Sequence, residues 1–229
     1  MKTIVFDAGP IISLTMNNLL WILEPLKKIS NAGFCITEQV KRELVDTPLN
    51  KTRKYMFEAL QVLHYIENKT LEVIDDDSVR NQAYELLSMA NNCFSAFGHN
   101  IQIVHEAEMS AIALCLQKKA DAFAVDEKTA RLLMENPDRL HHILKHTLHT
   151  KVEKNKENLS KFRKITRSIR IIRSVELVTI AYEKGLLDKY LSNMQSSRKT
   201  LLESVLWGVK LNGCAVSKRE IEQIVKMES

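Results

Sequence analysis

The sequence predicts an α/β fold built on an open parallel sheet, and two neighbouring features indicate this class. Residues 3–6 form a short β-branched run bounded by turn residues, which is typical of a strand buried on both faces. Gly9 and Pro10 then permit a tight turn into a helix. Asp7 lies between strand and helix, in the crevice where such folds bind ligands. Taken alone, Asp7 is equally well explained as a helix cap.

Composition is that of an ordinary soluble globular chain, with 229 residues, 45% hydrophobic and 27% charged. This length is enough to bury a core, and it suits one large domain or a domain with a small extension. The net charge of +5 permits a polyanionic partner without requiring one, because binding to nucleic acid depends on where the charge is clustered.

No targeting or membrane segment is expected. The chain begins directly with a strand, and no apolar run reaches the roughly 18 residues that a membrane helix needs. The four cysteines are scattered and include no Cys-x-x-Cys pair. We therefore expect reduced thiols in a cytoplasmic protein that does not bind membranes.

The remaining elements continue to alternate along the chain. Helices are expected at residues 17–29 with an interruption at Pro25, from 37 onward, at 52–67, from 78 to about 97, from about 104 and at 128–135. Strands are expected at residues 34–36 and 71–74, and residues 121–127 are expected to form a further strand and the turn that leaves it. A separate turn is expected at residues 47–50. This order is that of a parallel sheet with helical crossovers.

Three further carboxylates take positions like that of Asp7. Glu43 lies one position from an apolar helical stripe, where it is most simply a half-exposed helix residue unless other acids converge on it. Glu108 precedes a small apolar stretch by one helical turn, whereas Glu106 points about 160° away. Asp126 follows a buried strand, as Asp7 does. Such acids repel one another in an empty crevice, and a hard divalent cation, Mg²⁺ or Mn²⁺, is the simplest reason to gather them.

With these four acids in place, residues 1–136 resemble the PIN-domain family of metal-dependent ribonucleases. The matching motifs are Asp7-Ala8-Gly9-Pro10-Ile11-Ile12, Ile36-Thr37-Glu38-Gln39-Val40 leading to Glu43, the Glu108 helix, and Val125-Asp126-Glu127. More faintly, residues 180–187 and 213–217 resemble the tail of an archaeal and bacterial subgroup of PIN proteins. The resemblance implies a three-layer α/β/α sandwich with a central parallel sheet and additional C-terminal helices.

The resemblance also implies a site, in which Asp7, Glu43, Glu108 and Asp126 bind Mg²⁺ or Mn²⁺ and carry out catalysis. Two departures from the family pattern stand out. Glu108 follows Ala107, where the subgroup often has a glycine, and Val125-Asp126-Glu127 replaces a common Thr-x-Asp exit. The second departure leaves either Asp126 or Glu127 as the fourth ligand, and we favour Asp126 because it directly ends the apolar strand.

Three regions follow from this pattern: a PIN-like domain at residues 1–140, a basic helical segment at 141–173, and a helical extension at 174–229 packed on the first domain. The basic segment is most simply a long solvated helix. Alternatively it binds phosphates, because clustered Lys and Arg release counterions from RNA or DNA. The residues that we expect to contact nucleic acid are Arg163, Lys164, Arg167 and Arg170.

The leading hypothesis is a Mg²⁺- or Mn²⁺-dependent endoribonuclease that hydrolyses single-stranded or structured RNA. The alternative is a catalytically weak or inactive PIN scaffold that binds nucleic acid or a protein partner. A phosphatase with an aspartyl nucleophile is disfavoured, since Gly9 occupies the position where a second carboxylate is needed. Both a toxin and an RNA-processing enzyme suit this chemistry, and the resemblance suggests a homodimer and an antitoxin-like protein as protein partners.

Overall fold

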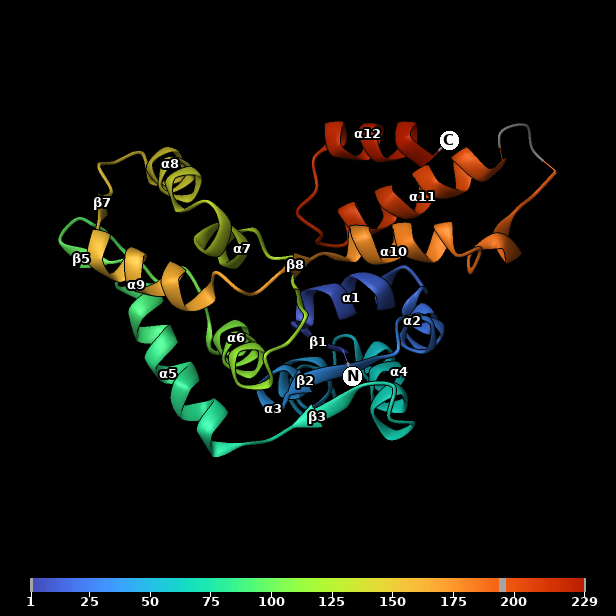
Figure 1. The fold of residues 1–229 in the computed structure, drawn as a ribbon, viewed down its shortest axis with the longest axis horizontal. Helices are drawn as coiled ribbons and strands as arrows, with labels where there is room; N and C mark the ends of the chain where they lie inside the picture. Colours follow the sequence, from blue (N-terminus) through green and yellow to red (C-terminus); the bar gives the residue numbers. More distant parts are fainter. Residues whose placement is uncertain (1, 194–196, 229) are drawn as a thin grey trace.

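The computed structural model describes residues 2–193 and 197–228 and is organised around a parallel sheet of five strands (Figure 1). Across the sheet the order is β3 (Glu72–Ile74), β2 (Ala32–Thr37), β1 (Lys2–Phe6), β6 (Ala122–Ala124) and β8 (Ile171–Ile172). A small antiparallel sheet contains β5 (His99–Asn100), β4 (Phe94–Ala96) and β7 (Glu153–Lys154).

Helices connect the strands and follow the last of them. They are α1 (Ala8–Met16), α2 (Leu23–Ser30), α3 (Glu38–Lys41), α4 (Met56–Glu67), α5 (Asp77–Asn91), α6 (Glu106–Lys118), α7 (Lys128–Glu135), α8 (Pro137–Leu148), α9 (Lys156–Thr166), α10 (Ser174–Glu183), α11 (Ser197–Leu211) and α12 (Lys218–Glu228). Short 3₁₀ or π turns are η1 (Leu20–Ile22), η2 (Arg42–Asp46), η3 (Pro48–Thr52) and η4 (Asp188–Tyr190). None of the helices in the described part of the chain is long and apolar enough to cross a membrane.

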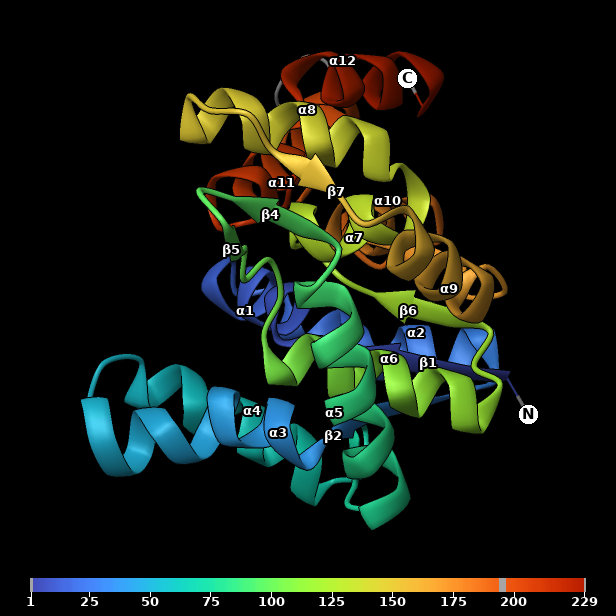
Figure 2. The same ribbon diagram turned by 90° about the vertical axis from the view of Figure 1, so that its left-hand side faces the viewer.

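The two faces of the sheet bury separate cores, because successive side chains of a strand point to opposite faces. Phe6 packs with α1, α2 and the C-terminal helices, whereas its neighbour Val5 packs with α5, α6, α7 and α9. Figure 1 shows the sheet between these two groups of helices, and Figure 2 looks onto the face that carries α5 and α6. The fold is therefore an α/β/α sandwich with C-terminal helices, which confirms the predicted fold class.

Strand order places the candidate site at the point where the direction of winding reverses. The chain runs outward from β1 to β2 and β3, and it later returns to the other side of β1 as β6. The crevice beyond the carboxyl ends of β1 and β6 is the usual ligand site of an open parallel sheet. Asp7 follows β1 here, and its backbone N–H donates to the carbonyl oxygen of Ala124 at 2.9 Å.

Three local expectations were wrong. The expected turn at 47–50 is helical, because Pro48 occupies the first position of η3, where no backbone donor is needed. The expected helix from 78 to about 97 ends at Asn91, whose side-chain oxygen instead accepts from the backbone of residues 103 and 104. The long helix considered for 141–173 is divided into the end of α8, β7, α9 and β8.

The C-terminal region is joined to the sheet as well as packed on it. Strand β8 pairs with β6, and α10 and α11 both contact α1. Apolar residues of α10, α11 and α12 belong to the same buried cluster as Phe6 and Ile11. These helices therefore cover the face of the sheet that carries α1 and α2 (Figure 1).

Candidate active site and metal centre

Asp7 combines a structural position with an unfavourable charge. Its side chain caps α1 by accepting from the Gly9 N–H at a long 3.4 Å. Only 5% of the residue is exposed, and burial, followed by the charge of Glu108, raises its pKa to about 7. Gly9 leaves room beside it, since a Cβ there would lie 3.2 Å from the Cβ of Asp126 and crowd that residue. Asp7 is thus a buried acid in the tight turn that follows β1.

Glu108 lies in the first turn of α6 and turns inward. One carboxylate oxygen accepts from the His105 N–H at 2.5 Å, which closes a capping box at the helix start. Burial, together with the charges of Glu127 and Glu43, raises the pKa of Glu108 to about 7 against the opposing effect of this hydrogen bond. Glu106 is exposed, so the predicted difference between these two glutamates is confirmed.

Glu43 lies in the π turn η2, at the edge of the crevice. The next two residues, Leu44 and Val45, are buried and hold the turn in place. Glu43 itself is exposed to solvent. The surrounding protein still withdraws its carboxylate partly from water and raises its pKa, against the opposing charge of His105. We name Asp7, Glu43, Glu108 and Glu127 the acidic crevice, because the charges of Glu43 and Glu108 raise the pKa of Asp7, and those of Glu43 and Glu127 raise the pKa of Glu108.

Asp126 is buried next to this crevice but is already strongly hydrogen-bonded. Its carboxylate accepts from the Ser13 hydroxyl at 2.6 Å, the Ser174 hydroxyl at 2.7 Å and the Ser174 backbone N–H at 2.8 Å. The last donor is the first residue of α10, where a helix favours a negative charge. Asp126 therefore links α1, β6 and α10. The role of Ser174 was missed from the sequence, where nothing marks a serine after Arg173 as its partner.

Glu127 projects differently from its neighbour. One of its carboxylate oxygens accepts from the Ala130 N–H at 2.7 Å and caps α7, and its charge acts on Glu108. Its second oxygen accepts no hydrogen bond from the residues that the structure describes. The two alternatives for the fourth acid thus have distinct surroundings among the described residues: Asp126 accepts the three hydrogen bonds given above and also faces the Cys214 thiol, whereas Glu127 accepts one from Ala130.

The donor set suits a hard divalent ion by its chemistry. It consists of carboxylate oxygens, and the charges that raise the pKa values of Asp7 and Glu108 come from other carboxylates. Within residues 2–193 and 197–228, however, no three acidic, His or Cys side chains stand close enough to hold one ion as they are placed. Binding would therefore require side-chain rotation, for which Glu43 at the exposed edge has the most room.

The fold and the crevice together define a class of protein. Its members have a parallel α/β sheet, and buried carboxylates without positively charged partners lie where the winding of the sheet reverses. A family model described as a PIN domain matches residues 3–138, and the chain belongs to this family. PIN domains are generally nucleases, they typically use divalent metals, and the family generally binds RNA and often pairs with antitoxins. No curated protein and no solved structure matches the chain significantly.

The raised pKa values predict how stability depends on pH. Between about pH 4 and pH 7 the folded protein holds protons on Asp7 and Glu108 that the unfolded chain has lost, so these groups lower the free energy of unfolding as pH rises. We expect Glu108→Gln to gain stability relative to the parent between pH 5 and pH 8 without divalent ions. Melting curves of both proteins in chelator test this expectation.

Added Mn²⁺ should act in the opposite direction, because its carboxylate ligands must be deprotonated. It should raise the melting temperature of the parent more at pH 8 than at pH 5, and raise that of Glu108→Gln less. If the difference in melting temperature between the two proteins stayed constant across the pH range, Glu108 would not be a buried acid with a raised pKa.

Proposed function

We propose that this protein is a metal-dependent endoribonuclease that hydrolyses RNA phosphodiester bonds at the acidic crevice. Asp7, Glu43 and Glu108 would hold Mg²⁺ or Mn²⁺, with Asp126 or Glu127 as the fourth ligand. The ion would supply an activated water and stabilise the leaving oxygen. The protein's own residues would orient the phosphate between β1 and β6 and restrict water around Asp7.

One observation carries the proposal. Asp7 and Glu108 are buried acids whose pKa values are raised to about 7, and the neighbouring charges that contribute to this rise belong to other acids. Such an arrangement lowers the stability of the protein without a bound cation. Carboxyl groups with strongly shifted pKa values are typical of functional sites. A cation would relieve the repulsion, which gives the sequence a physical reason to retain the acids.

The direct test is cleavage of single-stranded RNA by the purified full chain with Mg²⁺, Mn²⁺ or chelator. We expect internal cuts with either ion and none in chelator. The alternative, a scaffold that binds nucleic acid or a protein without cutting, draws support from the separation of the acids as placed. RNA binding without cleavage under all three conditions would favour that scaffold. Sedimentation of the chain alone would test a homodimer, and co-purification would test an antitoxin-like partner.

The basic segment provides a separate prediction about RNA affinity. Arg163, Lys164, Arg167 and Arg170 are exposed, and none forms an ion pair within the described residues. Arg170 immediately precedes β8, so it lies toward the amino-terminal edge of the sheet, away from the acidic crevice. We propose that these residues contact RNA phosphates beyond the cleaved bond.

Replacing all four with Ala should weaken RNA binding and flatten its salt dependence, by about one unit of slope for each phosphate that the variant no longer neutralises. Cleavage at saturating RNA should change little, since the residues supply no chemistry. Anisotropy titrations at several salt concentrations measure the slope, and a variant with Lys199, Lys218 and Arg219 replaced serves as a control of similar charge change on α11 and α12. An unchanged slope would assign the segment to a structural or protein-binding role.

A further inference from the structure

We propose that the pocket beside Glu43 binds one unpaired guanine base of the RNA and thereby places an adjacent phosphate at the acidic crevice. This inference rests on the proposed function, because it makes the pocket a substrate subsite of the same site. It adds what the acids alone do not provide, namely a preference for a particular nucleotide next to the cleaved bond.

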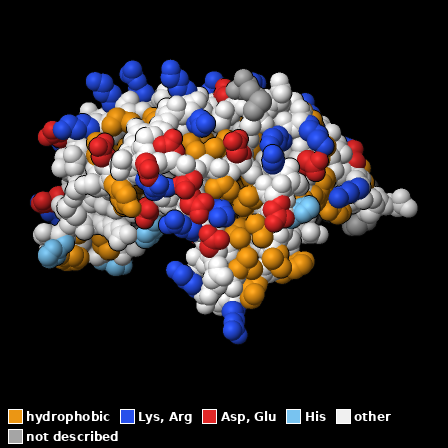
Figure 3. Space-filling view, turned by 90° about the horizontal axis from the view of Figure 1, so that it is seen from below, with side chains coloured by type: hydrophobic (Ala, Val, Ile, Leu, Met, Phe, Trp, Pro, Cys, Tyr) orange, Lys and Arg blue, Asp and Glu red, His pale blue; other side chains and the backbone are white. Residues whose placement is uncertain are grey.

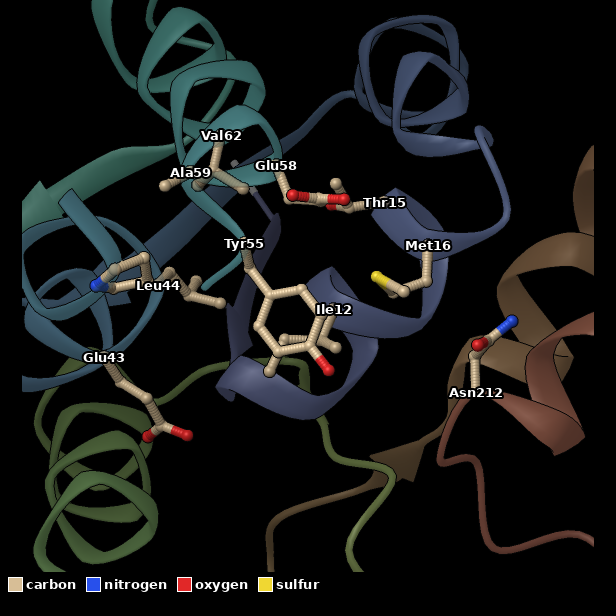
Figure 4. A pocket seen from close by; sticks show the side chains of 11 residues that line it. Ile12, Thr15, Met16, Glu43, Leu44, Tyr55, Glu58, Ala59, Val62 and Asn212 are labelled. Carbon is tan, nitrogen blue, oxygen red and sulfur yellow. The ribbon is translucent and has the colours of Figure 1, made fainter. Parts of the chain in front are cut away.

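The pocket has the size and walls that a single base requires. Its volume is about 280 Å³, near the lower limit of about 300–1,000 Å³ for small-molecule sites. Ile12 and Met16 of α1 line one side, and Ala59 and Val62 of α4 line the other (Figure 4). These walls are apolar and suit the flat faces of a base, which gains free energy by leaving water.

Tyr55 supplies the aromatic surface on which a base can stack. Its ring stands over Ile12 at the mouth of the pocket in Figure 4, and 47% of the residue is exposed. Tyr55 directly precedes α4 and has a left-handed backbone (φ 64°). Its side chain therefore starts at the amino-terminal end of α4, beside the pocket. Sequence-specific recognition of RNA typically stacks an unpaired base on such a ring.

Glu58 provides the polar contact that would select guanine. It lines the pocket and is half-buried, and no side chain in the described ranges 2–193 and 197–228 bonds to its carboxylate. An ionised carboxylate only accepts hydrogen bonds, at two parallel oxygens. The Watson–Crick edge of guanine presents two adjacent N–H donors, whereas adenine, cytosine and uracil each place an acceptor beside a donor. Glu58 therefore matches guanine and disfavours the other bases.

Glu43 connects this pocket to the chemistry. It lines the pocket, and its charge also acts on Asp7 and Glu108. Figure 4 shows Glu43 and Glu58 on different sides of Tyr55, so a base stacked on the Tyr55 ring with its Watson–Crick edge toward Glu58 would direct its sugar and phosphate toward the side of Glu43. A base and its own phosphate are neighbours in RNA, and the structure places their two candidate sites next to each other.

Positive charge flanks the pocket as a phosphate-binding surface requires. We name Lys51, Arg53 and Lys54 the basic rim; all three are exposed, and none is ion-paired in the part of the chain that the structure covers. The Lys54 ammonium lies 4.6 Å from the centre of the Tyr55 ring. Figure 3 shows a protruding lobe with gathered hydrophobic side chains and Lys or Arg at its end. The charge favours RNA over an apolar protein segment as the occupant.

The test is binding of four fluorescent RNA pentamers, UUGUU, UUAUU, UUCUU and UUUUU, to the full chain in chelator. We expect UUGUU to bind at least about tenfold more tightly than the others, which is the discrimination that one bidentate base contact provides. Glu58→Gln should remove most of this preference, because Gln offers a donor to one of the guanine N–H groups. Glu67→Gln, an acid-to-amide change at the end of the same helix, should leave it intact.

Tyr55→Ala should weaken the binding of all four RNAs about equally, whereas Tyr84→Ala on α5 should not weaken it. Because chelator removes cleavage, a guanine preference that depends on Glu58 would support the subsite even if the chain proved not to be a nuclease. Cleavage without a guanine preference would overturn the subsite and leave the nuclease standing. Equal binding of all pentamers, or binding unaffected by Tyr55→Ala, would overturn it as well, the latter pointing to a protein partner on this lobe.

Discussion

Asp7→Asn is expected to abolish RNA cleavage while the protein stays folded and at least as stable. Asn keeps the size of the side chain and an oxygen that can accept from the Gly9 N–H. It removes a negative charge from a buried group whose pKa is raised to about 7, so repulsion with Glu108 disappears. We expect cleavage to fall at least about 100-fold, which corresponds to about 2.7 kcal/mol of lost transition-state stabilisation.

The measurement is the rate of RNA cleavage with Mg²⁺ or Mn²⁺, together with a melting curve at pH 8. Asp121→Asn is a matched control, because Asp121 also accepts a backbone hydrogen bond beside β1, but at the opposite edge of the sheet. If Asp7→Asn cuts RNA at the parental rate, Asp7 is only a cap. If it unfolds instead, the residue was structural, and the catalytic proposal loses its main support.

A pair of substitutions is expected to separate the two alternatives for the fourth acid. Asp126→Asn should lower the free energy of unfolding by roughly 2–3 kcal/mol, because an amide cannot accept from Ser13 and both Ser174 donors as a carboxylate does. Glu127→Gln keeps an oxygen for the Ala130 N–H and should leave stability nearly unchanged. Its effect should instead appear as weaker Mn²⁺ binding.

Calorimetric titration with Mn²⁺ and chemical denaturation of both variants provide the comparison, with Ser174→Ala as a third protein. Ser174→Ala removes one donor to Asp126 without touching any acid, so it should share the stability loss but retain metal binding. The reverse pattern, in which Asp126→Asn stays stable and loses the metal, would identify Asp126 as the ligand.

Local signals allowed much of the fold to be predicted from the sequence. The β1 run with Asp7, the Thr37 cap of α3 and the inward face of Glu108 depend on residues only a few positions apart, and the structure confirms them. The end of α7 at Glu135 also falls as expected, since Asn136 and Pro137 start a new helix. Chemistry within one turn of a helix is readable without tertiary information.

Features that depend on distant partners were missed. Strand β8 has only two residues and follows a basic segment, so its pairing with β6 leaves no pattern in the chain. The donors to Asp126 lie 113 and 48 positions away, at Ser13 and Ser174. The pocket likewise joins α1 to α4 across the π turns, whose geometry no propensity indicates. Convergence of the four acids in one site stays a prediction.

The link between Asp126 and α10 bears on how this protein can be divided. The family match ends at residue 138, yet β8 and the helices after it lie beyond that limit. A polypeptide ending there would leave Asp126 without its Ser174 donors, β6 as an unpaired edge, and the apolar face of α1 open to water. The residues that the family model matches are therefore not self-contained in this structure, because the pairing of β6, the hydrogen bonds of Asp126 and the cover over α1 are all completed by the chain after residue 138.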